Sequence, residues 1–279
     1  MSNTTTFGQL PAVTIRAGDG AEATVTLYGG HLVSWRTADG QERLFCSRDS
    51  ALDGSRAIRG GVPVIFPQFG ARGNGMRHGF ARVAAWQAGE HGVDDGAAFA
   101  EFTLHHTGLP EAIATAWRHA FTLRLRVSVH AHKLELSLTV HNTGNQAFPF
   151  SAALHTYYKI DQLSAARIEG LQHLRYSDDT PQDALQAEER LQFADKLDRI
   201  YYQLPGPLTL RSGASTLQMT QQGFTDAVVW NPGAQDAAAL PDLADDEYAH
   251  FICIEPALIQ PGILAAGAQW IGRQQLEFI

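Results

Sequence analysis

The sequence predicts an all-β fold, and three features of the chain lead to this prediction. Apolar and polar residues alternate over 121–129 and again over 134–140, with a short polar turn at 130–133 between them. Successive side chains of a strand point to opposite faces of the sheet, so this alternation indicates an antiparallel hairpin with one buried face. Similar short segments recur along the chain, and turn residues separate most of them. This spacing is typical of a sandwich or a barrel.

The other strand candidates are spread over the whole chain. They are 23–28, 31–35, 97–105, 168–169, 208–210, 216–220, 227–230, 251–255 and 275–279. The best helix candidate is 183–195, which is rich in Ala, Gln, Glu and Leu, although an ordered loop explains it nearly as well. No internal repeat, low-complexity tract or linker divides the sequence. We therefore predict one large β-domain over residues 1–279.

Composition limits the class of protein and its partners. The 279 residues are 44% hydrophobic, which is ample for a core, and their formal net charge is −8. Nucleic-acid binding needs a broad basic face, so this charge argues against a nucleic-acid partner. Cys46 and Cys253 form no CxxC pair, so neither a disulfide scaffold nor zinc is indicated.

The cellular location is also an expectation from sequence. The N-terminal residues lack the basic and apolar regions of a signal peptide, and no apolar run reaches the roughly 18 residues of a membrane span. We expect a soluble cytoplasmic protein without a membrane partner. A monomer is favoured, while the oligomeric state stays open.

Residues 54–89 form a basic segment that contains no Asp, Glu or Lys. It holds five arginines, which are Arg56, Arg59, Arg72, Arg77 and Arg82, and it is rich in Gly and Pro. Loop-like backbone often carries binding groups, and the arginine fork matches phosphate or carboxylate. The cluster therefore indicates an anion pocket that is not a P-loop, because GxxxxGK[ST] is missing. Any single arginine is better explained as a solvated surface residue paired with an acid such as Asp53 or Glu90.

Three ionisable residues stand in unusual settings. His78 lies inside the basic segment, His155 lies where an apolar run meets a polar-aromatic stretch, and Glu255 ends the apolar strand FICIE. Such a group is paired, solvated at a strand end, or tuned for chemistry. The chain has no HExxH motif, no compact His/Cys/Asp cluster and no GxSxG elbow, so we expect neither a metal site nor a serine nucleophile. The residues alone leave the roles of these groups open.

Several longer segments together resemble the hexose-6-phosphate mutarotase (glucose-6-phosphate 1-epimerase) branch of the aldose 1-epimerase superfamily. The matching segments occur in the family's order and span most of the chain. They are SRAIRGGVPVIFPQFG at 55–70, RHGFAR at 77–82, ALHTYYKI at 153–160, LDRIYY at 197–202, DAVVWNP at 226–232 and FICIEPA at 251–257.

The resemblance implies a large antiparallel β-sandwich of the galactose-mutarotase type. It implies an isomerase that interconverts the α and β anomers of a hexose 6-phosphate without a cofactor or metal. By position, His155 and Glu255 correspond to the catalytic pair. The residues that correspond to substrate-binding positions are Arg59, Arg77, His78, Arg82 and Asp198. Arg77 stands at a position that is not always Arg in relatives, and His78 resembles the second active-site histidine of galactose mutarotases.

Other functions remain open at this point. The same scaffold could be a sugar-phosphate sensor without catalysis, which would have no need of the His155–Glu255 pair. It could also be a mutarotase of free or acidic sugars, whose carboxylate would meet the arginines. A glycoside hydrolase would need two carboxylates, and only Glu255 has a persuasive setting. Trp230 is expected either to pack on the sugar face or to belong to the core.

Overall fold

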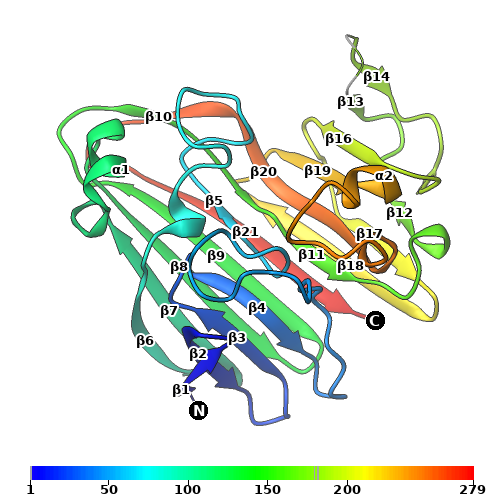
Figure 1. The fold of residues 1–279 in the computed structure, drawn as a ribbon, viewed down its shortest axis with the longest axis horizontal. Helices are drawn as coiled ribbons and strands as arrows, with labels where there is room; N and C mark the ends of the chain where they lie inside the picture. The colour runs from blue at the N-terminus through cyan, green and yellow to red at the C-terminus, as the bar shows by residue number, and fades with distance from the viewer. Residues whose placement is uncertain (1, 179, 181) are drawn as a thin grey trace.

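The computed structural model describes residues 2–178, 180 and 182–279, and antiparallel strands dominate it (Figure 1). The N-terminal strands form a four-stranded sheet in chain order. They are β1 (Ser2–Phe7), β2 (Leu10–Arg16), β3 (Glu22–Thr26) and β4 (His31–Arg36).

A nine-stranded sheet contains the hairpin that the alternation predicts. β8 and β9 pair directly, with Leu125 opposite Leu138, and along β8 every apolar residue of the alternation is buried. The sheet order is β15 (Arg190–Gln192), β12 (Arg167–Glu169), β17 (Leu208–Ser212), β18 (Ser215–Gln222), β21 (Gln269–Phe278), β9 (Lys133–Asn142), β8 (Phe121–His130), β7 (Ala97–His105) and β6 (Gln87–Asp94).

An eight-stranded sheet is built around the long strand β20. Its order is β14 (Ala184–Leu185), β13 (Arg175–Ser177), β16 (Leu197–Tyr201), β19 (Asp226–Asn231), β20 (Phe251–Leu264), β10 (Phe148–Leu154) and β5 (Val64–Ile65), and β11 (Tyr157–Lys159) also pairs with β20.

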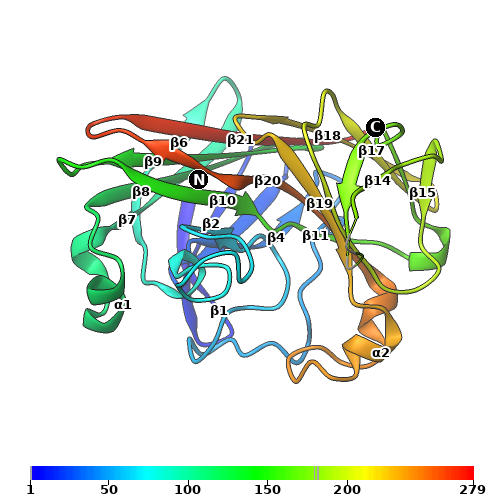
Figure 2. The ribbon, with the colours of Figure 1, turned by 90° about the horizontal axis from the view of Figure 1, so that it is seen from above.

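The two large sheets lie in layers, and the loops that connect β5 to β6 lie beneath β10 and β20, on the side away from β9 and β21 (Figure 2). The main hydrophobic core draws side chains from all three sheets, for example Trp35 of β4, Leu136 of β9 and Ile254 of β20. Each of these side chains is at most 2% exposed, so burial of apolar area holds the layers together.

Helices are short and lie in the connections. The α-helices are α1 (Glu111–Ala116) and α2 (Gly233–Ala237), and the 3-10 helices are η1 (Ala81–Val83), η2 (His106–Gly108), η3 (Leu163–Ala165) and η4 (Glu247–His250). Among the described residues, none of the helices has the length and apolar character that a membrane span requires.

The all-β prediction is confirmed, and every strand candidate overlaps an observed strand. The helix predicted at 183–195 is wrong, because this segment holds β14, β15 and the turns between them. Leu191 and Phe193 are buried on either side of the exposed Gln192, which is the period of a strand. High helix propensity in this segment therefore yields to tertiary packing. The single-domain organisation stays a prediction.

Candidate active site

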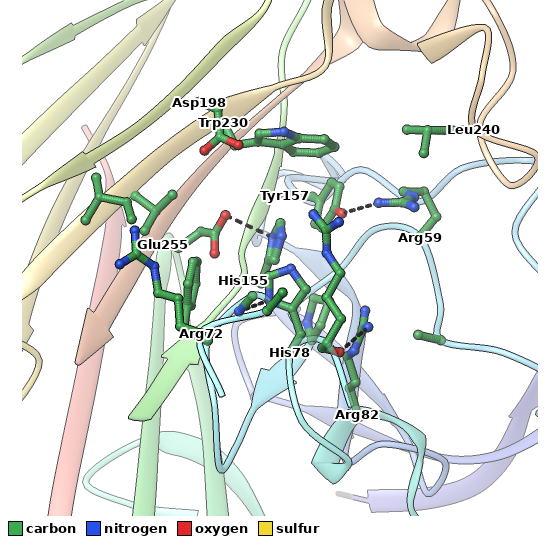
Figure 3. A pocket seen from close by; sticks show the side chains of 18 of the residues that line it. Arg59, Arg72, His78, Arg82, His155, Tyr157, Asp198, Trp230, Leu240 and Glu255 are labelled. Atoms are coloured by element: carbon green, nitrogen blue, oxygen red, sulfur yellow. Dashed lines mark hydrogen bonds and ion pairs between the residues drawn. The ribbon is translucent and has the colours of Figure 1, made fainter. Parts of the chain in front are cut away.

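A cavity of about 460 Å³ lies over the face of the eight-stranded sheet, where β16, β19 and β20 run side by side (Figure 3). All seven residues that the sequence analysis selected line this cavity. They are Arg59, Arg77, His78, Arg82, His155, Asp198 and Glu255. The structure therefore brings together groups that are widely separated in the sequence.

The floor of the cavity follows from strand register. Val228 of β19 lies opposite Glu255 of β20 and opposite Ile200 of β16. Two residues further along β19, Trp230 lies opposite Asp198 of β16. Alternate residues of a strand share a face, so all of these side chains project from the same side of the sheet.

His155 and Glu255 meet on this floor. His155 follows β10 directly, and its Nδ1 lies 3.3 Å from Oε1 of Glu255 (Figure 3). The Glu255 side chain is 1% exposed and that of His155 is 11% exposed. The imidazole stacks on the ring of Tyr157, with centroids 4.9 Å apart and an interplanar angle of 10°. The orientation of His155 is thus fixed by a ring on one side and a carboxylate on another.

Burial changes the proton affinity of both groups. It raises the pKa of Glu255 well above its ordinary 4.5, with a further contribution from the nearby Asp198. Burial also lowers the pKa of His155 well below 6.5, assisted by His78 and Arg59. Low-dielectric surroundings favour the uncharged form of each group, so the pair carries one exchangeable proton, which lies on Glu255 when both groups are uncharged.

One wall of the cavity is the glycine-rich loop that carries His78. His78 has φ 62°, and its Nδ1 accepts a hydrogen bond from the Gly70 amide at 3.3 Å, which leaves the proton on Nε2. Burial and the charges of Arg82 and Arg77 lower the pKa of His78 to about 3. At Gly79, which has φ 69°, an added Cβ would lie 2.0 Å from a backbone oxygen of Phe66, so the HGF motif needs glycine there.

Four of the five arginines of the basic segment line the cavity, whereas Arg56 does not. Arg72, Arg77 and Arg82 make no ion pair within the described part of the chain. Arg82 is half-buried and donates from Nη2 to the Arg77 carbonyl at 2.9 Å, and burial lowers its pKa. Positive charge without local acids makes this wall suitable for an anion.

Arg59 is an exception, because it pairs with a carboxylate. Its Nη2 and Nε lie 3.0 and 3.2 Å from Oδ1 of Asp242, and its Nη1 donates to the Tyr157 hydroxyl at 3.1 Å. Neither Asp53 nor Glu90 is its partner. Asp242 and Tyr157 also line the cavity, and the sequence analysis missed both. Tyr157 was detectable in principle because it stands two residues after His155; nothing local marks Asp242.

The fold and the site together define a class: a β-sandwich protein with a cavity that joins a buried histidine–glutamate pair to a cationic wall. The chain belongs to the aldose 1-epimerase family, whose model matches residues 11–277. The family assignment expected from the sequence motifs is confirmed.

Individual relatives agree with the family assignment. A protein of Cenchrus ciliaris named "Putative glucose-6-phosphate 1-epimerase" is 34% identical, over 97% of this chain and 85% of its own. A solved structure from Salmonella typhimurium, described as a "putative mutarotase", superposes with a TM-score of 0.89 at 26% identity, over 99% of this chain and 93% of that one. A galactose mutarotase-like protein from Clostridium acetobutylicum has a TM-score of 0.80 at 16% identity, over 100% and 98% of the two chains, and shows the same fold.

Proposed function

We propose that the chain is a hexose-6-phosphate mutarotase, which interconverts the α and β anomers of a sugar such as glucose 6-phosphate. The observation that carries the proposal is the buried contact between His155 and Glu255 at the floor of an arginine-lined cavity. The names of the similar proteins support the same reaction. A protein that only bound sugar phosphate would have no use for this pair.

Anomer exchange needs two coupled proton transfers. A base removes the proton of the C1 hydroxyl while an acid protonates the ring oxygen, so the C1–ring-oxygen bond breaks and C1 becomes a carbonyl. Rotation about C1–C2 then exposes the other face of the carbonyl. Ring closure runs the same transfers backwards and returns both protein groups to their starting protonation states.

Glu255 and His155 can perform these transfers, one as the acid and the other as the base, and they exchange these roles when the ring closes. The two groups share one proton and lie against each other, so a proton taken from one oxygen of the sugar is balanced by a proton given to the other. Each positioned acid or base typically contributes about 10²–10⁴-fold to the rate. Because the reaction is a net isomerisation, this pair accounts for all the proton movements.

The arginines give the proposal its specificity for a phosphorylated sugar. Arg77 and Arg82 reach the cavity without an acidic partner in the described residues, so we propose that they bind the 6-phosphate. Arg59 contributes its remaining donors beside them. Asp198 and His78 are proposed to bind sugar hydroxyls, and Trp230, also in the cavity lining, to cover an apolar face of the ring.

A substrate panel tests the proposed specificity. Anomer exchange is measured by NMR on equilibrated glucose 6-phosphate, glucose and glucuronate, each with and without the protein. We expect acceleration that is strongest for the phosphate. Fastest exchange for glucuronate would reassign the arginines to a carboxylate, and fastest exchange for glucose would remove their role in specificity.

We also propose that the protein acts as a monomer in the cytoplasm. Cys46 and Cys253 are both free thiols, which suits a reducing compartment. Size-exclusion chromatography with light scattering tests the monomeric state.

A further inference from the structure

A thiol lies beside the acid–base pair. Cys253 stands two residues before Glu255 on β20, so the two side chains leave the same face of the sheet. A ring nitrogen of His155, Cys253 Sγ and a carboxylate oxygen of Glu255 all lie within 4.8 Å of one another. In the strand register Cys253 lies opposite Tyr157 on one side and Trp230 on the other. The sequence analysis did not predict this cluster, because His155 follows β10 whereas Cys253 and Glu255 lie on β20.

Two polar atoms of the cluster have no hydrogen-bond partner. His155 Nδ1 and Glu255 Oε2 are both buried, and neither makes a hydrogen bond within the described residues. Buried polar atoms nearly always have a partner, so two such atoms side by side need an explanation. A proton transfer to substrate uses them only during turnover. Between turnovers a cation can replace the proton that the pair shares and use these lone pairs.

The spacing of these atoms suits a tetrahedral metal ion. Zinc binds imidazole nitrogen and carboxylate oxygen at about 2.0–2.2 Å, which places the two ligand atoms about 3.3–3.5 Å apart in a tetrahedron. His155 Nδ1 and Glu255 Oε1 are already 3.3 Å apart. A thiolate at about 2.3 Å from the metal requires Sγ to lie about 3.6 Å from each of the others. Because the three ligand atoms lie within 4.8 Å of one another, the distances from Sγ have to shorten by about 1.2 Å at most.

We propose that His155, Cys253 and Glu255 form an inhibitory site for a thiophilic divalent cation such as Zn²⁺. The cation would displace the proton of the Cys253 thiol and the proton that His155 and Glu255 share, and both would pass to solvent. It would then occupy the nitrogen and oxygen lone pairs that transfer protons, so its binding stops anomer exchange. The inhibition rests on the proposed function, whereas the binding itself does not. Three protein ligands leave a fourth position for water.

The surroundings determine which cations bind and how tightly. Soft or borderline ions accept a thiolate and an imidazole, whereas Mg²⁺ prefers an octahedron of oxygen ligands and keeps its water. The guanidinium groups of Arg59 and Arg82 lie close enough to influence the charge of His155, and they oppose an incoming cation. We therefore expect weaker binding than in a structural zinc site with thiolate ligands.

A spectroscopic titration tests the site without any sugar. Metal-free wild-type protein is titrated with Cd²⁺, and the ultraviolet charge-transfer band of a cadmium–thiolate bond is recorded. Cys46→Ser is the matched control, because Cys46 is the other free thiol of the chain. We expect the band in the wild type and in Cys46→Ser, and its loss in Cys253→Ser. A band that survives in Cys253→Ser would overturn the proposal, as would a band that Cys46→Ser abolishes.

Inhibition of anomer exchange is then compared in the same three proteins, each relative to its own metal-free rate. We expect the Zn²⁺ concentration for half inhibition to rise at least tenfold in Cys253→Ser and to stay unchanged in Cys46→Ser, with no effect of Mg²⁺. Equal Zn²⁺ sensitivity of all three proteins would contradict the site. If Cys253→Ser fails to fold, Glu255→Gln replaces it in the Cd²⁺ titration, where binding must weaken at least tenfold. The Cd²⁺ titration measures binding and needs no mutarotase activity. Failure of the metal site can therefore be distinguished from failure of the proposed function.

Discussion

The guanidinium of Arg59 lies 3.0 Å from the carboxylate of Asp242, from Nη2 to Oδ1, and a second contact joins Nη2 to Oδ2 at 3.2 Å. An arginine of the acid-free segment 54–89 is therefore neutralised by an acid from far along the chain. The positive potential of the cavity consequently depends more on Arg72, Arg77 and Arg82, whose charges have no such partner in the described residues.

Replacing Asp242 by Asn should strengthen phosphate binding and weaken the fold. The amide oxygen can still accept from Arg59, but the negative charge beside the cavity is lost, so the attraction for the phosphate increases. We expect a lower KM for glucose 6-phosphate and a free energy of unfolding smaller by about 1–3 kcal/mol, since Arg59 then donates to a neutral oxygen in place of a carboxylate. Initial rates and denaturant unfolding measure the two effects. A higher KM would show that Asp242 mainly holds Arg59 in place.

Removing either member of the acid–base pair should abolish most of the activity. We expect His155→Ala and Glu255→Gln each to lower kcat by about 10²–10⁴-fold. The double variant should lose little more than the worse single variant, because the two groups act as a unit. Circular dichroism checks that each variant is folded. Additive losses in the double variant would show that the residues act separately.

Arg82→Ala should raise KM for the phosphorylated sugar and leave the exchange of free glucose unchanged. A hydrogen bond to a charged group contributes about 1.5–3 kcal/mol, so KM for glucose 6-phosphate should rise about 10- to 100-fold while exchange of glucose is unchanged. Arg56→Ala is the matched control, because Arg56 belongs to the same segment but does not line the cavity. Equal effects of the two substitutions on KM would refute the assignment of Arg82 to the phosphate.

The pH dependence of kcat should reflect the lowered pKa of His155. The active pair carries one proton, and acid inactivates it by adding a second proton to the imidazole. Because burial holds that pKa well below 6.5, kcat should stay constant as the pH falls through 6.5 and decline only in more acidic solution. The use of kcat avoids the titration of free phosphate, whose second pKa is about 6. A half-maximal kcat at pH 6.5 would mean that His155 titrates as a solvated group.

A histidine outside the cavity should contribute to the decrease in the free energy of unfolding in acid. His31 is fully buried, its Nε2 donates to the Gly60 carbonyl at 2.7 Å, and burial lowers its pKa from 6.5 to about 4. Between these values the unfolded chain binds the additional proton, so stability present above pH 6.5 is lost as the pH falls toward 4. The loss from this group is about 3 kcal/mol at most.

Denaturant unfolding at pH 7 and at pH 4.5 measures this contribution. We expect His31→Gln, which keeps a donor for Gly60, to lose less stability between the two pH values than the wild type does. His105→Gln, at an exposed position, serves as the control and should behave like the wild type. An unchanged pH dependence in His31→Gln would exclude His31 as the cause.

Local patterns were sufficient to predict much of the fold. The alternation over 121–140 defines β8 and β9, because both strands bury one face in a single core. The helix expected at 183–195 failed for the converse reason. Its composition favours helix, but Leu191 and Phe193 pack into the core two residues apart, and this packing outweighs intrinsic preference.

The site was predictable only as far as its motifs extend. The acid-free segment indicated an anion pocket, and His155 and Glu255 were recognised by their sequence settings. The partner of Arg59 and the thiol beside Glu255 were not. Asp242 lies on a distant loop, and no local pattern in the sequence specifies its contact with Arg59. The period of two in the predicted strand 251–255 places Cys253 on the same face as Glu255, but its approach to His155 depends on contacts between separate segments.

Two-dimensional exchange NMR on equilibrated glucose 6-phosphate tests the central claim most directly. Spectra are recorded with the wild type, with the His155→Ala/Glu255→Gln double variant, and without protein. The account predicts strong cross-peaks between the α and β anomeric signals for the wild type alone. Cross-peaks of equal strength in the double variant would show that the pair does not catalyse the exchange, and no acceleration by the wild type would contradict the proposed function itself.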